Sequence, residues 1–295
     1  MELYAPIVLF TFNRLEETKR TVEALKKNYL ANKTELIIFS DAACKRSDIG
    51  KVEAVRDYLK TIKGFKSVLV NESLHNKGLA KSIIEGVSEV FTNSDKVIVL
   101  EDDLITSPNF LDFMNQALDH YQDSKKVFSI SGYTMNLPSL EGYPKDFFLG
   151  YRASSWGWGT WKENWEKVDW KVSDYSDFRL NPLQQLKFMK GGSDLPRMLR
   201  RQMNNEIDSW AIRWCYDQFK RKMYTVFPSS SKVISIGFGE NATHTKDTVR
   251  FDTFLDKSNQ RSFSFDDTIE IDKILVSEFR KKFSYKNRLF ETFFK

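Results

Sequence analysis

The chain has 295 residues, of which 41% are hydrophobic and 29% are charged. This balance excludes a disordered or collagen-like chain and supplies enough apolar material for a core. Formal net charge is only +5, and the two cysteines, Cys44 and Cys215, are too few for a disulfide scaffold and lack metal-knuckle spacing. We therefore expect a protein of a reducing compartment, of a length that suits one α/β unit with an appendage.

The first apolar run, Ile7 to Phe12, has no basic segment before it and is too short for a signal peptide or a membrane span. No other stretch approaches the ~20 apolar residues that a spanning helix needs. We expect a cytoplasmic protein whose contact with a membrane is at most peripheral, at its inner face.

Residues 1–131 alternate short apolar runs with amphipathic stretches. The predicted strands cover 6–12, 35–40, 67–70, 96–100 and 127–131. The predicted helices cover 16–28, 51–62 and 79–91, and a fourth opens at Ser107-Pro108 with Ser107 as its N-cap. Apolar strands that alternate with helices predict a parallel sheet covered on both faces, which is a Rossmann-like arrangement.

The pattern changes after residue 131. Residues 133–193 are rich in Gly, Pro and aromatic side chains, and two helices are predicted over 195–204 and 208–222. A β-leaning segment, 224–236, leads into a Gly-rich run, 237–245, and the tail from 272 to 295 reads as helical and basic. We expect one continuous sheet rather than two separable domains.

Polar side chains follow the predicted strands where each strand ends. They are Asn13 and Arg14, then Asp41, then Asn71 and Glu72, then Glu101, Asp102 and Asp103. Ligands bind at this edge in open parallel sheets. Neither a Gly-x-Gly-x-x-Gly motif nor a Walker A sequence is present, so those two kinds of phosphate cradle are excluded.

The acidic triplet Glu101-Asp102-Asp103 is the most informative of these clusters. Three consecutive carboxylates repel one another unless a cation compensates them, and their hard oxygen atoms suit Mg²⁺ or Mn²⁺. The alternative is a solvated acidic turn that favours the dipole of the next helix. Its position after the fourth strand favours metal or nucleotide binding.

The order of four segments, APIVLFTFNR, FSDAA, NKGLAKSIIEGV and VIVLEDDLITSPNFLDF, resembles a GT-A-fold glycosyltransferase. The likeness is to the inverting N-acetylglucosaminyltransferase I type and to related bacterial sugar transferases. Three later segments, VFSISGYTMN, SSWGWGTWKENWEKVDW and EIDSWAIRW, resemble that family's following strand, its Gly-Trp segment and the segment with its catalytic aspartate. The resemblance extends over roughly residues 5–245.

The resemblance implies a role for each matching residue. It places Asn13 and Arg14 near the nucleobase, Asp41 on the base or ribose, Asn76, Gly78 and Lys81 along the nucleotide, Glu101 and Asp102 at the ribose and sugar, Asp103 on the metal, and Asp208 as the catalytic base. The metal would be Mn²⁺ or Mg²⁺, bound to the donor's diphosphate.

The implied enzyme is an inverting, metal-dependent hexosyl- or N-acetylhexosaminyltransferase of glycan or surface-polysaccharide synthesis. Its donor would be a nucleotide sugar, with a UDP-sugar favoured, and its acceptor a saccharide or a lipid-linked saccharide. The implied fold is a mixed sheet flanked by helices. We expect a nucleotide-sugar-binding half over 1–131, an acceptor-binding half over 132–270 and a basic aromatic tail over 271–295.

Asp208 has a second interpretation from the bare residues, as the N-cap of the helix that follows it, and Glu206 competes with it as a base. Trp161 and Trp165 lie at i and i+4 and are predicted to pack in the core. Trp156, beside glycines, is a candidate donor-binding residue that stacks on a sugar ring. His244 is a candidate diphosphate or metal ligand, with an exposed surface histidine as the alternative.

Two basic patches account for the positive charge: residues 186–223 hold 9 basic and 4 acidic side chains, and residues 271–295 hold 7 and 3. Such patches can meet nucleic acid, anionic lipid or phosphorylated substrates, but composition favours solvated helix faces, and neither patch calls for nucleic acid. The aromatic and basic tail suits an anionic membrane surface, or a helix docked on the core.

Two rival functions remain. A sugar-nucleotidyltransferase would share the nucleotide-binding half but carry a Gly-rich basic loop after the first strand, where LFTFNRLEET has none. A polyanion-binding module would use the basic patches without a divalent metal, and the acidic triplet disfavours it.

Overall fold

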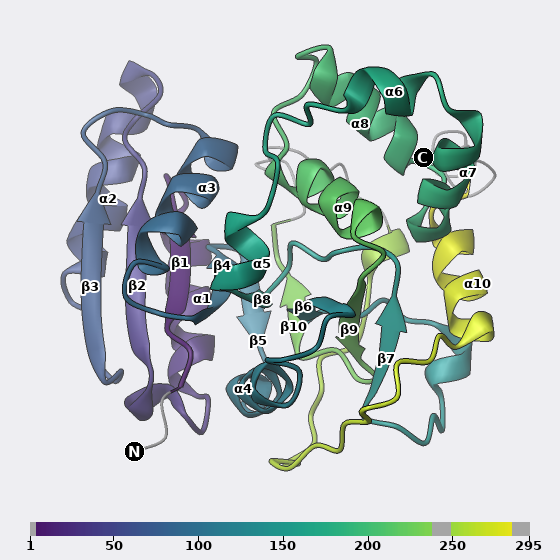
Figure 1. Cartoon of the computed structure of the whole chain (residues 1–295). Helices are drawn as coiled ribbons and strands as arrows, with labels where there is room; N and C mark the ends of the chain where they lie inside the picture. The colour runs from purple at the N-terminus through teal and green to yellow at the C-terminus, as the bar shows by residue number, and fades with distance from the viewer. Residues whose placement is uncertain (1–3, 238–248, 285–295) are drawn as a thin grey trace.

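The computed structural model describes residues 4–237 and 249–284 (Figure 1). An eight-stranded sheet has the order β3-β2-β1-β4-β8-β6-β9-β7. Its strands are β1 (Ile7–Thr11), β2 (Glu35–Ser40), β3 (Ser67–Glu72), β4 (Lys96–Glu101), β6 (Val127–Ser131), β7 (Phe147–Gly150), β8 (Trp158–Trp161) and β9 (Tyr224–Pro228). A two-stranded sheet pairs β5 (Leu104–Thr106) with β10 (Val233–Ser235).

Helices flank the large sheet (Figure 1). They are α1 (Leu15–Lys26), α2 (Ile49–Leu59), α3 (Leu79–Val90), α4 (Phe110–His120), α5 (Lys162–Glu166), α6 (Tyr175–Arg179), α7 (Pro182–Phe188), α8 (Leu195–Met203), α9 (Trp210–Lys220) and α10 (Lys273–Lys282). Short 3₁₀ turns are η1 (Ala31–Lys33), η2 (Arg46–Asp48), η3 (Pro138–Leu140), η4 (Met189–Gly191) and η5 (Val249–Phe251). The expected fold class, a mixed α/β sheet covered by helices, is confirmed.

Alternation along β1 explains why both faces are covered. Leu9 joins the apolar cluster that α1, α2 and α4 complete, whereas Val8 joins the cluster completed by α3, α8 and α9. All five residues of β1 are buried, so the strand reads as a continuous apolar run. This central strand therefore fixes the edge at which the polar residues that follow it, Asn13 and Arg14, emerge.

Strand β8 makes the sheet mixed, because it runs antiparallel to both β4 and β6. The sequence did not predict it, since its residues, Trp158–Trp161, lack an apolar alternation. A Cβ at Gly159 would lie 2.9 Å from the carbonyl oxygen of Val97, so only glycine permits this close pairing. Strand β7 was missed for a similar reason, within a Gly- and aromatic-rich stretch.

Two predicted helix starts are wrong. Helix α4 begins at Phe110 with Asn109 in the N-cap position, and Ser107 instead donates a 2.7 Å hydrogen bond to the Asn109 side chain. Helix α9 begins at Trp210 rather than at Asp208. In both cases the polar residue nearest the helix, rather than the first polar residue of the loop, occupies the cap.

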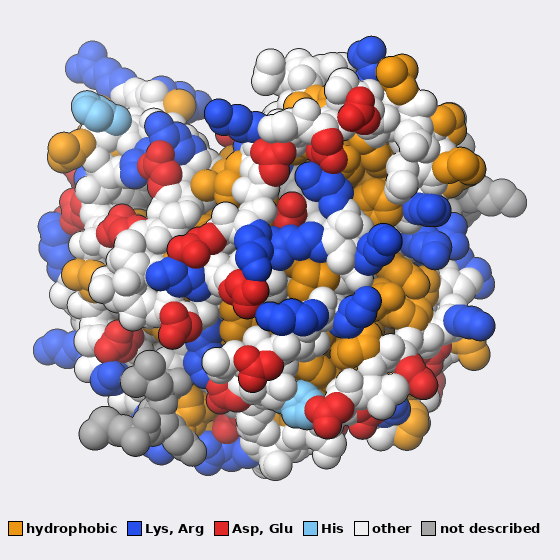
Figure 2. Space-filling model, in the orientation of Figure 1, with side chains coloured by type: hydrophobic (Ala, Val, Ile, Leu, Met, Phe, Trp, Pro, Cys, Tyr) orange, Lys and Arg blue, Asp and Glu red, His pale blue; other side chains and the backbone are white. Residues whose placement is uncertain are grey.

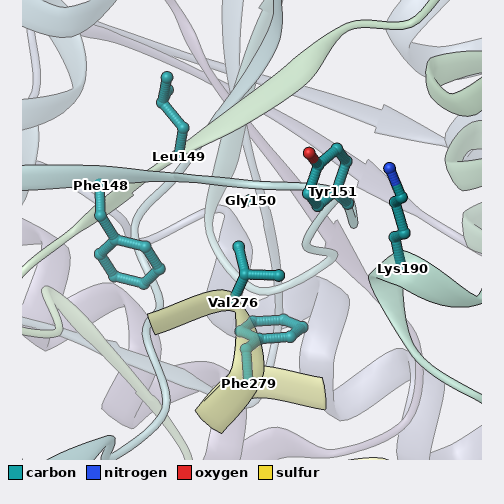
Figure 3. Close-up of a pocket in the computed structure, with 7 residues that line it drawn as sticks. All are labelled: Phe148, Leu149, Gly150, Tyr151, Lys190, Val276 and Phe279. Atoms are coloured by element: carbon teal, nitrogen blue, oxygen red, sulfur yellow. The ribbon is translucent and has the colours of Figure 1, made fainter. Parts of the chain in front are cut away.

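Helix α10 packs on the sheet. Figure 3 shows Val276 and Phe279 of this helix on the same side of β7 as Phe148, whereas Leu149 points away from them. The gap between them has a volume of about 10 Å³, room for about one water molecule, so it is a packing gap and not a binding site. The first part of the tail is therefore docked on the core, and residues 285–295 lie outside the described part of the chain.

Across residues 4–237 and 249–284, no helix is long and apolar enough to span a bilayer.

Candidate functional site

The order of the strands brings the ends of β1 and β4 together. The chain runs from β1 outward to β2 and β3, then returns to place β4 on the other side of β1. This reversal is the topological switch point, at whose carboxyl edge open α/β sheets bind ligands. Arg14 follows β1 here, and Asp102 and Asp103 follow β4.

A guanidinium bridges the two aspartates. Arg14 forms an ion pair with Asp102 through Nη2, and its Nη1 donates a 3.0 Å hydrogen bond to Oδ2 of Asp103. Burial alone would lower the pKa of Arg14, but the two carboxylates outweigh burial and hold that pKa above its usual range. Arg14 therefore stays charged and joins the ends of two neighbouring strands.

Three acids at this edge share the single positive charge of Arg14. Burial, with the charges of Asp103 and Asp102 added, raises the pKa of Glu101 to about 8. Burial also raises the pKa of Asp102 to about 6, although Arg14 lowers it. Ionisation of all three acids beside one guanidinium is therefore disfavoured unless further positive charge is added, and a divalent cation would supply it.

The carboxylates at this edge could bind a divalent cation only together with ligands from another molecule, such as substrate phosphates. In the described ranges, no three His, Cys, Asp or Glu side chains converge in a way that could hold a metal ion. Magnesium and manganese commonly bind through one or two carboxylates together with substrate phosphates. Asp103 suits that use, because it is the partly exposed last acid of the triplet.

The backbone at Gly237 lies against Asp103. Strand β5 follows Asp103 and pairs with β10, and the amide of Ile236 donates a 2.8 Å hydrogen bond to the Asp103 carbonyl. A Cβ on Gly237 would lie 2.0 Å from Oδ2 of Asp103, so any larger residue here would displace the Asp103 carboxylate. The predicted Gly-rich run thus begins against the acidic cluster, whereas its His244 lies outside the described residues.

Asp41 organises the turn that precedes α3. Its carboxylate accepts hydrogen bonds from the backbone amides of Ala42, Lys77 and Gly78, each at 2.9 Å, and from the Asn76 side chain at 3.1 Å. Gly78 adopts a positive φ of 74°, which favours glycine. The structure brings three predicted donor-site residues together here, with Asp41 as their common anchor.

Two further predicted donor residues contact other partners. Asn13 donates a 3.2 Å hydrogen bond to Asp48, which is 5% exposed and immediately precedes α2. Lys81 is exposed and forms a 3.7 Å ion pair with Glu85 one turn along α3. Asn13 is thus fixed at the edge of the site, while Lys81 lies on a solvated face.

Sequence reasoning missed two residues that shape this edge. Arg56 donates hydrogen bonds to the carbonyls of Ser73 and Ser40, at 2.7 and 3.4 Å, and so joins the ends of β2 and β3. Thr21 donates a 2.9 Å hydrogen bond to the Asp102 carbonyl and accepts one at 3.1 Å from the Leu104 amide. Both lie in helices whose periodic patterns give no sign of these contacts.

Asp208 lies just before α9. Ser209 caps this helix by accepting a hydrogen bond from the Ile212 amide, so the interpretation of Asp208 as the N-cap is wrong. The Asp208 side chain is 68% exposed and forms a 3.3 Å ion pair with Arg213. Its neighbour Trp210 stacks on Trp158 at 5.0 Å.

That stacking places the start of α9 at the carboxyl edge of the sheet. Trp158 is paired with Val99 near the end of β4, two residues before Glu101. Asp208, two residues before Trp210, is therefore held on the same edge as the acidic cluster.

Trp156 lines an aromatic pocket of about 160 Å³. It makes edge contacts with Tyr133 and Phe251, at centroid distances of 4.6 and 5.8 Å. The other lining residues come from two loops, from β9 and from the end of the chain: Met135, Arg152, Ala153, Ser154, Ser155, Phe227, Phe279 and Phe283. Trp161 and Trp165 are 5% and 1% exposed, which confirms their predicted place in the core.

No protein-family model and no curated protein matches the chain. Solved structures offer distant likenesses. One is the mannosyltransferase PcManGT from Pyrobaculum calidifontis in complex with GDP-Man and Mn²⁺, at 12% identity and a TM-score of 0.39, over 57% of this chain and 47% of that one.

Two others are structures of S. aureus TarS. The first, of residues 1–349, has 9% identity and a TM-score of 0.45, over 80% of this chain and 61% of that one. The second has 12% identity and a TM-score of 0.39, over 57% and 30%. This chain spans less than two thirds of each of the three structures, and likenesses this distant define neither its substrates nor its reaction.

Proposed function

We propose that this chain is a GT-A-type glycosyltransferase that transfers a sugar from a nucleotide-sugar donor to a saccharide acceptor with inversion. One observation carries the proposal: three acids, Glu101, Asp102 and Asp103, share a single guanidinium at the topological switch point, and burial together with their mutual repulsion raises the pKa of Glu101. A divalent cation bridging to a diphosphate is the ligand that such an edge suits.

In this proposal the donor lies along the carboxyl edge of β1, β2 and β4. Asn13 and the turn that Asp41 holds border the nucleotide, and Glu101 and Asp102 face the ribose and sugar. Asp103 holds Mn²⁺ or Mg²⁺, which when bound stabilises the charge of the departing diphosphate. The motif resemblance favours a UDP-sugar.

Asp208 acts as the base. The acceptor hydroxyl attacks the anomeric carbon as the bond to the diphosphate breaks, and Asp208 takes the hydroxyl proton. Attack from the face opposite the leaving group inverts the anomeric configuration, as in single-displacement glycoside chemistry. The exposed position of Asp208 at the sheet edge leaves its carboxylate accessible to an acceptor.

The pocket beside Trp156 suits the acceptor. Aromatic faces bind the apolar faces of sugar rings, and Ser154 and Ser155 supply hydroxyl groups at the same pocket. The proposal assigns residues 1–131 to the donor, 132–270 to the acceptor and 271–295 to a tail whose helix α10 closes one side of this pocket.

A sugar-nucleotidyltransferase fits less well. Such an enzyme needs a basic, Gly-rich loop after the first strand to hold a triphosphate. Here only residues 12–14 separate β1 from α1, and Arg14 is bound to two carboxylates.

A thermal-shift panel tests the proposal. The full chain is heated with UDP-, GDP- and dTDP-sugars, each with and without Mn²⁺, and one donor is expected to raise the unfolding temperature only when Mn²⁺ is present. Asp103→Ala should remove that dependence on Mn²⁺. Asp57→Ala, which removes a surface carboxylate of α2 that is paired with Lys60, should leave it unchanged. Absence of metal-dependent stabilisation by any donor would overturn the proposal.

A further inference from the structure

Three exposed leucines lie at the end of α6 and along α7. Leu180, Leu183 and Leu186 are 76%, 69% and 62% exposed, and they recur every third residue. Flanking them, Phe178 and Phe188 are 6% and 1% exposed and fix the segment to the core. Single exposed leucines are ordinary, but three within seven residues form an apolar ridge, and such a ridge is typical of an interaction surface.

The stretch of chain that carries this leucine ridge is rich in basic residues. Residues 179–201 contain six basic residues, all exposed: Arg179, Lys187, Lys190, Arg197, Arg200 and Arg201. The single acidic residue of this stretch, Asp194, is already paired with Arg152 at 2.9 Å, and Arg201 pairs with Glu206 at 3.4 Å. Six basic residues against one acidic residue give this stretch a formal charge of +5.

Helix α10 extends the same basic face. It packs against η4, which follows α7, and Ser193 donates a 2.6 Å hydrogen bond to the Phe283 carbonyl at its end. The last turn of α10 adds three basic residues, Arg280, Lys281 and Lys282. Figure 1 shows α7 beside the end of α10, and Figure 2 shows hydrophobic and basic side chains interleaved along that side of the molecule.

We infer that the leucine ridge and the basic residues of this stretch bind the surface of an anionic lipid bilayer. Transfer of leucine side chains from water to the boundary of headgroups and acyl chains lowers the free energy, and lysine and arginine are attracted to anionic headgroups. A protein partner suits the ridge less, because protein interfaces have apolar cores depleted of charge. This inference does not depend on sugar transfer.

The apolar side of α10 takes no part in this membrane contact. Leu275 and Phe279 are 0% and 8% exposed and pack in the core, so they are not available to lipid. The exposed apolar groups of α6 and α7 are available, and the last turn of α10 supplies only charge.

Vesicle flotation of the full chain, without nucleotide sugar, tests the inference. Wild type should bind vesicles of phosphatidylcholine with phosphatidylglycerol, and binding should fall with salt and be weak on phosphatidylcholine alone. Substituting Leu180→Ser, Leu183→Ser and Leu186→Ser together should lower the partition coefficient by about tenfold or more. Leu74→Ser, at a leucine 90% exposed outside this face, should bind as wild type.

Two results would overturn the inference. One is absence of wild-type binding to anionic vesicles. The other is equal binding by the triple variant, which would assign contact to the basic residues or the rest of the tail. A wild-type oligomer that the triple variant loses, with no vesicle binding, would identify the ridge as a protein interface instead. The substituted side chains are exposed, so unchanged unfolding temperatures are expected and serve as the folding control.

Discussion

Glu101 holds a proton more tightly in the folded protein than in the unfolded chain. Burial and two neighbouring aspartates raise its pKa from 4.5 to about 8. Across that pH window the unfolded chain loses its proton first, so deprotonation favours unfolding, and stability falls as pH rises from about 4.5 to about 8. The cost of ionising Glu101 beside Asp102 and Asp103 can therefore be measured as a slope of stability against pH.

We predict that Glu101→Gln removes this slope. In chelator, the variant should match wild type near pH 5 and exceed its free energy of unfolding near pH 8 by about 1–3 kcal/mol, allowing for solvent screening. Urea unfolding across this pH range measures it. Asp102, whose pKa is raised to about 6, contributes its own decline in both proteins. Parallel pH curves would show that Glu101 is ionised and compensated in the folded state.

Asp208 and Glu206 are two acids of similar exposure before the same helix, which makes them a matched pair. We predict that Asp208→Asn lowers kcat for transfer by about 10²–10⁴-fold, the range for loss of a general base, while donor binding survives. Glu206→Gln should change kcat little. The two variants are compared in a transfer assay with the donor found by thermal shift. The opposite pattern would assign the base to Glu206.

At the scale of elements, two neighbouring residues at the start of α9 have different roles: Ser209 caps the helix, and Asp208 is the proposed base. The Ser209 hydroxyl accepts a hydrogen bond from the Ile212 amide, and the Ser209 amide donates a 2.6 Å hydrogen bond to the side chain of Gln202. We predict that Ser209→Ala lowers the free energy of unfolding by about 1 kcal/mol, the usual loss of a helix N-cap. Asp208→Ala should cost less than half of that, by urea unfolding at neutral pH. An equal cost would show that Asp208 shares the cap.

The elements of the first half could be predicted because their signals are local. β2 and β6 match the expected ranges, 35–40 and 127–131, because each carries its own run of β-branched and aromatic side chains. β8 could not be predicted, because Trp158–Trp161 carry no such run and Gly159 is selected by the Val97 carbonyl rather than by strand propensity.

The site was predictable as a set of strand ends but not as a set of contacts. The sequence placed Arg14 and the acidic triplet after separate strands, yet only the strand order makes β1 and β4 neighbours and brings Arg14 onto Asp102. Asp41 and Gly78 became one turn for the same reason, through the parallel pairing of β2 with β3. Non-local pairing, which local periodicity does not encode, assembled both clusters.

At the scale of the whole molecule, the end of the chain folds back over the middle. Asp256 forms an ion pair with Lys232, with both side chains almost fully buried, and accepts a 2.9 Å hydrogen bond from Asn109. Phe263 packs edge-on against Phe113 of α4 at 5.2 Å. These contacts make the segment before α10 part of the same core that positions β5, and hence Asp103.

Helix α10 completes that core, and its two faces give a matched test. Leu275 is 0% exposed within the apolar cluster of the sheet, whereas the adjacent Ile274 is 63% exposed. We predict that Leu275→Ala lowers the free energy of unfolding by about 2–5 kcal/mol, because it removes buried methyl groups and leaves a cavity. Ile274→Ala should change it by about 0.5 kcal/mol or less.

Urea unfolding followed by tryptophan fluorescence measures both variants. The reporters suit the test because Trp158, Trp165 and Trp214 lie across the sheet, in the cluster that Leu275 does not join. If α10 is integral, Leu275→Ala shifts one cooperative transition of the whole chain, since a cavity on one face weakens the sheet that both faces share. If Leu275→Ala leaves that transition in place, α10 is an independent appendage, and the pocket beside Trp156 loses its wall of Phe279 and Phe283 without loss of the fold.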